Sequence, residues 1–305
     1  MHGNSCDQDV QLREQVPVNA RSPKSVERMR VYGVDFTSRP SRRKPITCLE
    51  CVLEGGRLTT VHLSAWTSFA GFEALLCGPG PWIAGIDFPF GQARRFIEAI
   101  GWPQTWHGYV GKAEALGRDG FRAVLDHYRA RQPSGDKEHR RATDVVAGAI
   151  SPQKLYGTPV GLMFFEGAPR LRAAGVTIPV LQEGDAGRVV VEAYPGVLAR
   201  AMIGRRSYKQ DTKAKQTVEQ AAARQELLLQ ITDGAIRPLC GFDVNAPVDL
   251  TDDPGGDHLD AWLCAIQAGW AWTRRNSGFG LPSGTDPLEG WIADPTMTGS
   301  VAENR

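Results

Sequence analysis

Short apolar runs dominate the N-terminal part of the chain and predict a β-sheet. Strand-like runs occupy residues 30–36 and 82–88, and the second is continuously apolar, which is typical of a strand covered on both faces. Between them, segments 46–54 and 57–64 flank Gly55-Gly56, a strong hairpin-turn signal. A short helix is expected over residues 67–78, between a Thr or Ser cap and a glycine stop. This β-β-β-α-β order predicts a mixed sheet with helices packed on it.

The remaining pattern is mostly helical. Residues 92–175 show helical patterning broken by Gly and Pro, which we interpret as a long helical insertion. The pattern returns to β in "GRVVVEAYPG", whose apolar triplet ends on Glu192. Helices are expected over residues 213–232 and in "GGDHLDAWLCAIQAGWAW", which is apolar almost all round and hence buried. A short last strand in "EGWIAD" would close an edge of the sheet.

Length and composition favour one domain. We expect a disordered N-terminal extension over residues 1–28, a single domain over 29–295 and a flexible tail over 296–305. The 42% of hydrophobic residues allow a sizeable core. The net charge of +1 means that any contact with nucleic acid must come from local basic clusters. Six scattered cysteines indicate a reducing cytoplasm, and no apolar run predicts a membrane span or a secretory signal.

Acidic residues stand at the ends of four elements that the pattern predicts to be buried. They are Asp35, Asp87, Glu192, and the pair Asp257 and Asp260, whose i, i+3 spacing places both on one helix face. Carboxylates are rarely buried unless paired or metal-bound, and functional groups gather at strand ends in α/β sheets. Glycines two residues before the first two acids, in "GVDF" and "GIDF", would ease close packing. The joint pattern predicts a carboxylate cluster that holds two Mg²⁺ or Mn²⁺ ions for phosphoryl chemistry.

Each acid also has a purely structural interpretation. Asp257 could be a helix N-cap, with Asp260 favourable in the first turn. Asp35 and Asp87 could form turns, and Glu192 could be a solvated strand end. It is the joint pattern that favours the metal site over these separate explanations.

Basic segments follow two of the strands that end in acids. The segment "RAMIGRRSYKQDTKAK" could run along a phosphate backbone, with Lys209 and Lys213 as the expected phosphate contacts. Arg39, in a basic loop with Arg42, Arg43 and Lys44, could do the same after the Asp35 strand. The alternative for both segments is a solvated surface loop. Arg141 is a further candidate phosphate contact, although it could equally form a surface ion pair with Asp144 at i, i+3.

An ordered set of short motifs resembles the domain-of-unknown-function 429 family of predicted nucleases over roughly residues 30–295. The motifs are "GVDFT", "IAGIDFPFG", "RRATD", "VVVEAYPG", "YKQDTKAK", "GGDHLDAWLCAIQAGW" and "EGWIADP". The order of elements and acids is also similar to the ribonuclease H-like superfamily. This resemblance implies an α/β fold, a ribonuclease H-like mixed five-stranded sheet flanked by helices, with the long helical insertion. It further implies that Asp35 bridges both metals and that Asp87 and Asp260 complete them, with Glu192 and Asp257 as additional or alternative ligands.

Three functions remain open. The favoured one is a metal-dependent nuclease that hydrolyses phosphodiester bonds in DNA or RNA without a covalent intermediate. The second is an ATP-using phosphotransferase of the actin and sugar-kinase group, although "DFTSRP" lacks the glycine of that group's Asp-x-Gly-x-Thr motif. The third is a non-catalytic ribonuclease H-like binding module, in which the acids fix the fold or bind a structural metal.

Overall fold

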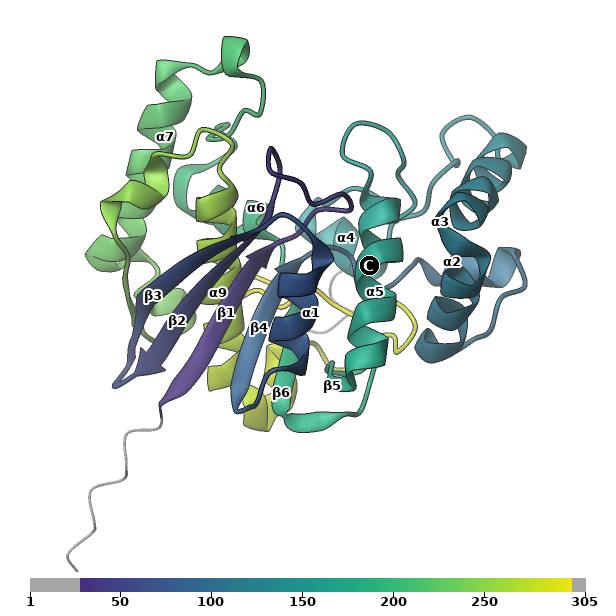
Figure 1. The fold of residues 1–305 in the computed structure, drawn as a ribbon, viewed down its shortest axis with the longest axis horizontal. Helices are drawn as coiled ribbons and strands as arrows, with labels where there is room; N and C mark the ends of the chain where they lie inside the picture. The colour runs from purple at the N-terminus through teal and green to yellow at the C-terminus, as the bar shows by residue number, and fades with distance from the viewer. Residues whose placement is uncertain (1–27, 298–305) are drawn as a thin grey trace, which may run out of the picture.

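The computed structural model describes residues 28–297 of the 305-residue chain. The predicted extension over residues 1–28 and the predicted tail over 296–305 lie, apart from their innermost residues, outside this range. The described residues form a mixed α/β fold in which helices flank a seven-stranded sheet (Figure 1). Within residues 28–297, every helix is too short or too polar to cross a membrane.

The sheet has the strand order β5-β6-β4-β1-β2-β3-β7. Its strands in chain order are β1 (Met29–Asp35), β2 (Ile46–Glu54), β3 (Arg57–Trp66), β4 (Trp82–Asp87), β5 (Val176–Thr177), β6 (Asp185–Glu192) and β7 (Asp243–Asn245). The first three form an antiparallel meander, and β4 and β6 run parallel to β1. The expectation of five strands was wrong, because two short edge strands, β5 and β7, extend the sheet.

Helices cover both faces of the sheet. In chain order they are α1 (Phe69–Cys77), α2 (Arg94–Ala99), α3 (Trp106–Arg131), α4 (Ala142–Ala147), α5 (Val160–Ala174), α6 (Pro195–Ile203), α7 (Val218–Gln230), α8 (Arg237–Cys240) and α9 (Asp257–Thr273). Side chains of α9, α6 and α7 pack on one face, whereas those of α1, α3 and α5 pack on the other. Figure 1 shows α1 in front of the sheet and α9 behind it. Helices α2 to α5 occupy the stretch in which the pattern predicts a helical insertion.

Two predicted elements differ from the structure. The helix expected over residues 213–232 begins later, because Thr217 and Gln220 form a reciprocal capping box at the start of α7. Lys213–Lys215 form a separate 3₁₀ turn before it. The segment "EGWIAD" makes a single parallel bridge between Ile292 and Glu192 rather than a strand.

Two glycines let α9 lie directly on the sheet. Gly33 of β1 and Gly85 of β4 are register partners on adjacent parallel strands. A Cβ atom on Gly33 would lie 1.8 Å from the carbonyl oxygen of Ala261, and one on Gly85 would lie 2.3 Å from that of Cys264. The expected close packing before each acid is therefore confirmed. This contact carries the first turn of α9 to the carboxyl ends of β1 and β4.

Candidate metal centre

Three of the predicted acids, Asp35, Asp87 and Asp260, meet at the edge of the sheet. One carboxylate oxygen from each lies within 4.8 Å of the other two. Asp35 and Asp87 are register partners at the ends of β1 and β4, and Asp260 is in the first turn of α9. Asp35 and Asp260 are buried, and Asp87 is half-buried. This group, the acid triad below, has the donors and spacing to hold a metal ion.

Burial and mutual repulsion dominate the electrostatics of the acid triad. Burial and the neighbouring carboxylates, Asp257 first among them, raise the pKa of Asp35 well above its usual value. Burial also raises the pKa of Asp87 to about 7, although the ammonium group of Lys209 opposes this shift. A bound cation would relieve both the desolvation and the mutual repulsion.

Two lysines already partner acids at the site. The Nζ atom of Lys209 and the hydroxyl of Tyr208 donate to different oxygens of Asp260. The Nζ atom of Lys44 lies 2.6 Å from Oδ1 of Asp257. Burial lowers the pKa of each lysine, but the facing carboxylates raise it more, so both pKa values are shifted upward. Both lysines therefore stay charged, and the phosphate contact expected of Lys209 stays a prediction.

Asp257 is not the helix cap. Gly256 occupies the N-cap position of α9, and Oδ2 of Asp253 accepts from the backbone N–H of Asp257 at 2.7 Å. The N-cap interpretation of Asp257 was therefore wrong, and the carboxylate is free to face Lys44. The capping role of Asp253 was missed, although an Asp before Pro254-Gly255-Gly256 is a local turn signal.

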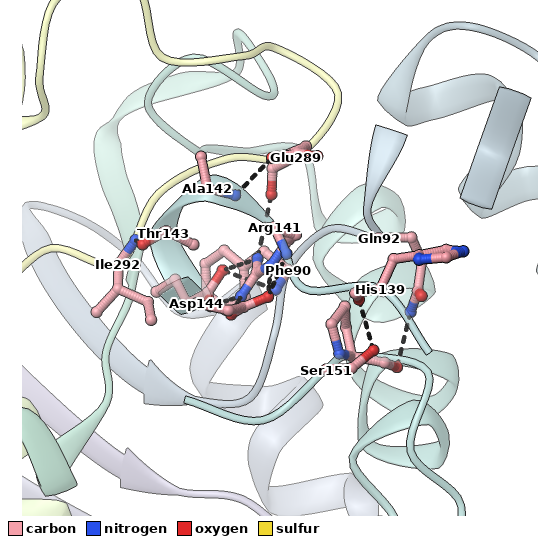
Figure 2. Close-up of polar contacts among 12 residues, drawn as sticks. Phe90, Gln92, His139, Arg141, Ala142, Thr143, Asp144, Ser151, Glu289 and Ile292 are labelled. Carbon is pink, nitrogen blue, oxygen red and sulfur yellow. Dashed lines mark hydrogen bonds and ion pairs between the residues drawn. The ribbon is translucent and has the colours of Figure 1, made fainter. Parts of the chain in front are cut away.

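Glu192 lies in a buried ion cluster instead of the acid triad. Its two carboxylate oxygens accept from Nη1 and Nη2 of Arg141 at 2.8 and 2.6 Å. The same guanidinium donates to both oxygens of Asp144, at 3.0 and 2.8 Å (Figure 2). Arg141, Asp144 and Glu192 are 1%, 2% and 4% exposed, and we call them the Arg141 cluster. Glu192 is therefore not a solvated strand end, and Arg141 and Asp144 form a buried ion pair, not a surface one. Both structural interpretations were wrong.

The Arg141 cluster is fastened to the C-terminal segment through Glu289. The backbone carbonyl of Glu289 accepts from Nη1 of Arg141 at 3.1 Å (Figure 2). Its carboxylate accepts from the backbone N–H groups of Arg94 and Ala142, at 2.8 and 3.0 Å. The guanidinium of Arg141 thus donates its hydrogen bonds to Asp144, Glu192 and Glu289, and a phosphate contact by this residue stays a prediction.

The acid triad opens into a cavity of about 400 Å³. Besides the triad, Asp257, Lys44 and Lys209 line it. A second cavity of about 240 Å³ adjoins it, and Asp87 and Lys209 line both. Arg39 and Lys213 are exposed on the loops that supply the lining residues Ser38 and Asp211. Their predicted phosphate contacts stay predictions.

Comparison with known protein families gives one match. The family described as "Protein of unknown function (DUF429)" matches residues 33–278, well over half of the chain. The chain belongs to the DUF429 family. No curated protein and no solved structure matches it. The DUF429 match contains the whole acid triad and the Arg141 cluster, whereas Glu289 lies beyond its end.

Proposed function

We propose that this DUF429 protein is a metal-dependent nuclease that hydrolyses phosphodiester bonds at the acid triad with Mg²⁺ or Mn²⁺. The observation that carries the proposal is the convergence of three carboxylate oxygens within 4.8 Å of one another beside an open cavity. Hard divalent cations prefer such oxygen ligands. Burial and the neighbouring carboxylates raise the pKa values of Asp35 and Asp87 despite Lys209, and a bound cation would offset both effects, so these residues fit the ions.

The topology supports a ribonuclease H-like assignment. An antiparallel meander of β3, β2 and β1 continues into the parallel strands β4 and β6, and a late helix, α9, covers the sheet. The acids stand on the first strand, the fourth strand and that helix, as the resemblance implies. In this assignment β5 and β7 are short additions at the two edges of the five-stranded core.

The residues take distinct roles in the proposed reaction. When bound, two divalent cations supply a nucleophilic water at neutral pH and offset charge on the attacking and leaving oxygens. Asp35, which faces both other acids, would hold both ions, and Asp87 and Asp260 would complete one each. Lys209 would exchange its contact with Asp260 for a contact with the substrate phosphate. Arg39 and Lys213 would bind flanking phosphates of DNA or RNA.

Metal binding and cleavage test this proposal together. We would titrate Mn²⁺ calorimetrically into the wild type, into Asp35→Asn/Asp260→Asn, and into the control Asp119→Asn, which changes an exposed acid on α3. Cleavage of single-stranded and duplex DNA and RNA would be followed with Mg²⁺ or Mn²⁺. Wild type and control should bind and cleave, and the double variant should do neither. Full cleavage by the double variant would refute the proposal.

Two further measurements, a calorimetric titration of ATP and a melting curve of each protein, discriminate the two alternatives. Saturable ATP binding without cleavage of nucleic acid would favour the phosphotransferase. A change in melting temperature in the double variant, with no activity in any protein, would favour the non-catalytic module.

A further inference from the structure

The smaller cavity beside the acid triad, which we call the side cavity, has its own chemical character. Part of its lining is apolar and consists of Ile150, Val160, Met163 and the ring of Tyr194. Phe88, which is 2% exposed, adds a second aromatic ring to the lining. The two cavities adjoin, because Thr158, Met163, Asp87 and Lys209 line both.

The charge of the side cavity disfavours a second phosphate. Its lining holds three carboxylates, from Asp87 and the Arg141 cluster, against two cations, Arg141 and Lys209. Oε1 of Glu192 and Oδ1 of Asp144 each accept one hydrogen bond from Arg141, and a carboxylate oxygen can accept a second. The polar part of the lining therefore favours a neutral group that donates hydrogen bonds.

The size of the side cavity sets the scale of its occupant. Its volume of about 240 Å³ is below the roughly 300–1,000 Å³ of pockets for drug-sized ligands, so it suits a single planar ring system. A base that is read outside its stack is held between apolar or aromatic side chains and recognised by hydrogen bonds to its edge. A ring with amino groups, attached to a phosphate in the neighbouring cavity, satisfies the size, the apolar lining and the acceptor groups together.

We propose that the side cavity binds the unstacked nucleobase next to the scissile phosphate, so that the substrate is a single strand or an unpaired nucleotide within a duplex. This inference rests on the proposed function for the placement of the phosphate. A base that stays stacked in a duplex cannot enter a separate side cavity. The protein therefore selects unpaired nucleotides by the shape of this cavity.

A binding experiment tests the base site without relying on cleavage. Calorimetry with Mn²⁺ present would compare deoxyadenosine 5′-monophosphate with 2-deoxyribose 5-phosphate, which lacks the base. We expect the nucleotide to bind about 10-fold more tightly, since contacts between a base and an aromatic ring are worth roughly 5- to 150-fold in affinity. Equal affinity for the two compounds would overturn the inference.

Cavity-filling variants supply the matched comparison. Ile150→Trp and Val160→Phe enlarge side chains that line only the side cavity, and Val145→Trp enlarges an exposed residue of α4 outside both cavities. The two filling variants should lose the preference for the nucleotide and keep the wild-type affinity for the sugar phosphate. Val145→Trp should keep both affinities. Unchanged nucleotide binding in Ile150→Trp and Val160→Phe would also overturn the inference.

Cleavage assays separate failure of the base site from failure of the proposed function. Mn²⁺-dependent cleavage could be equally fast at normal and abasic positions, and equally fast in single strands and duplexes. This result would refute the base site and support the nuclease. Base-dependent nucleotide binding without cleavage of any substrate would refute the nuclease activity and support the base site. Rapid cleavage of single strands, with slow cleavage at abasic positions, would support both.

Discussion

Replacing Arg141 by methionine removes the cation from the Arg141 cluster and leaves its two carboxylates buried. Methionine keeps an unbranched apolar side chain in the same space, so the main loss is the charge and its hydrogen bonds. Asp144 and Glu192 are 2% and 4% exposed and would have no opposite charge within the cluster. The variant therefore tests whether this cluster stabilises the fold.

The magnitude follows from burial. Removing one partner of a buried ion pair costs about 3–5 kcal/mol. Arg141 serves two buried carboxylates and the carbonyl of Glu289, which places the expected loss at the upper part of this range. For a domain of this size, the melting temperature should fall by about 2–4 °C per kcal/mol, hence by roughly 8–20 °C for a loss of about 4–5 kcal/mol.

The loss should depend on pH with a definite sign. Burial raises the pKa of Glu192 and Arg141 opposes this shift, so removing Arg141 raises the pKa of Glu192 further in the folded state. The folded variant then binds protons more tightly than its unfolded chain, so its stability rises as the pH falls. The deficit relative to wild type should therefore be larger at pH 8 than at pH 5.

Urea unfolding at both pH values measures this deficit. The matched control is Arg140→Met, which removes the neighbouring but exposed arginine and should change the unfolding midpoint little. The double variant Arg141→Met/Glu192→Leu removes one stranded carboxylate and should recover part of the loss. Equal midpoints for Arg141→Met and Arg140→Met at both pH values would refute the reasoning.

Further predictions concern the packing of α9 and the acid triad. Gly33→Ala forces a Cβ atom against the Ala261 carbonyl, so it should lower the free energy of unfolding by at least about 3 kcal/mol and abolish Mn²⁺ binding. The control Gly111→Ala places its Cβ atom 3.3 Å from the Arg172 side chain and should be tolerated. Equal melting temperatures of the two variants would contradict this. The pKa of Asp87 is raised from 3.8 to about 7, so the stabilisation from its proton is present at low pH and is lost as the pH rises through that interval. Metal-free Asp87→Asn protein should therefore exceed wild type in urea midpoint at pH 8, and this advantage should vanish towards pH 4; a pH-independent difference would be inconsistent with the raised pKa. Mn²⁺ should raise the melting temperature of wild type in a concentration-dependent way and leave Asp35→Asn/Asp260→Asn unchanged; a similar rise in the double variant would place the ion elsewhere.

The long strands were predictable because their patterns are strong. The expected strands at 46–54 and 82–88 agree with β2 and β4 to within a residue. Strand β7 was not predictable, because Asp243–Asn245 is three residues long and contains two residue types that are depleted in strands. Its extended state depends on pairing with Arg57–Thr59, far away in the sequence.

The acids were predictable as a group, but their partners were not. Strand-end positions identified Asp35 and Asp87, since a run of apolar residues that ends on an acid is visible locally. The pairing of Glu192 with Arg141 is set by the helical segment that precedes β6, and the pairing of Asp257 with Lys44 is set by the loop after β1. A pattern along the chain does not reveal which basic side chain will face which carboxylate.

The contact between α9 and the two glycines has a consequence for biosynthesis. Asp35 and Asp87 leave the ribosome before Asp260, which belongs to the last α-helix of the described residues. A nascent chain, or one that breaks off between residues 87 and 260, carries an incomplete set of ligands. The acid triad is therefore complete only when α9 packs on Gly33 and Gly85. The activity proposed for the acid triad would therefore be absent from the chain until α9 has been synthesised and has packed on the sheet.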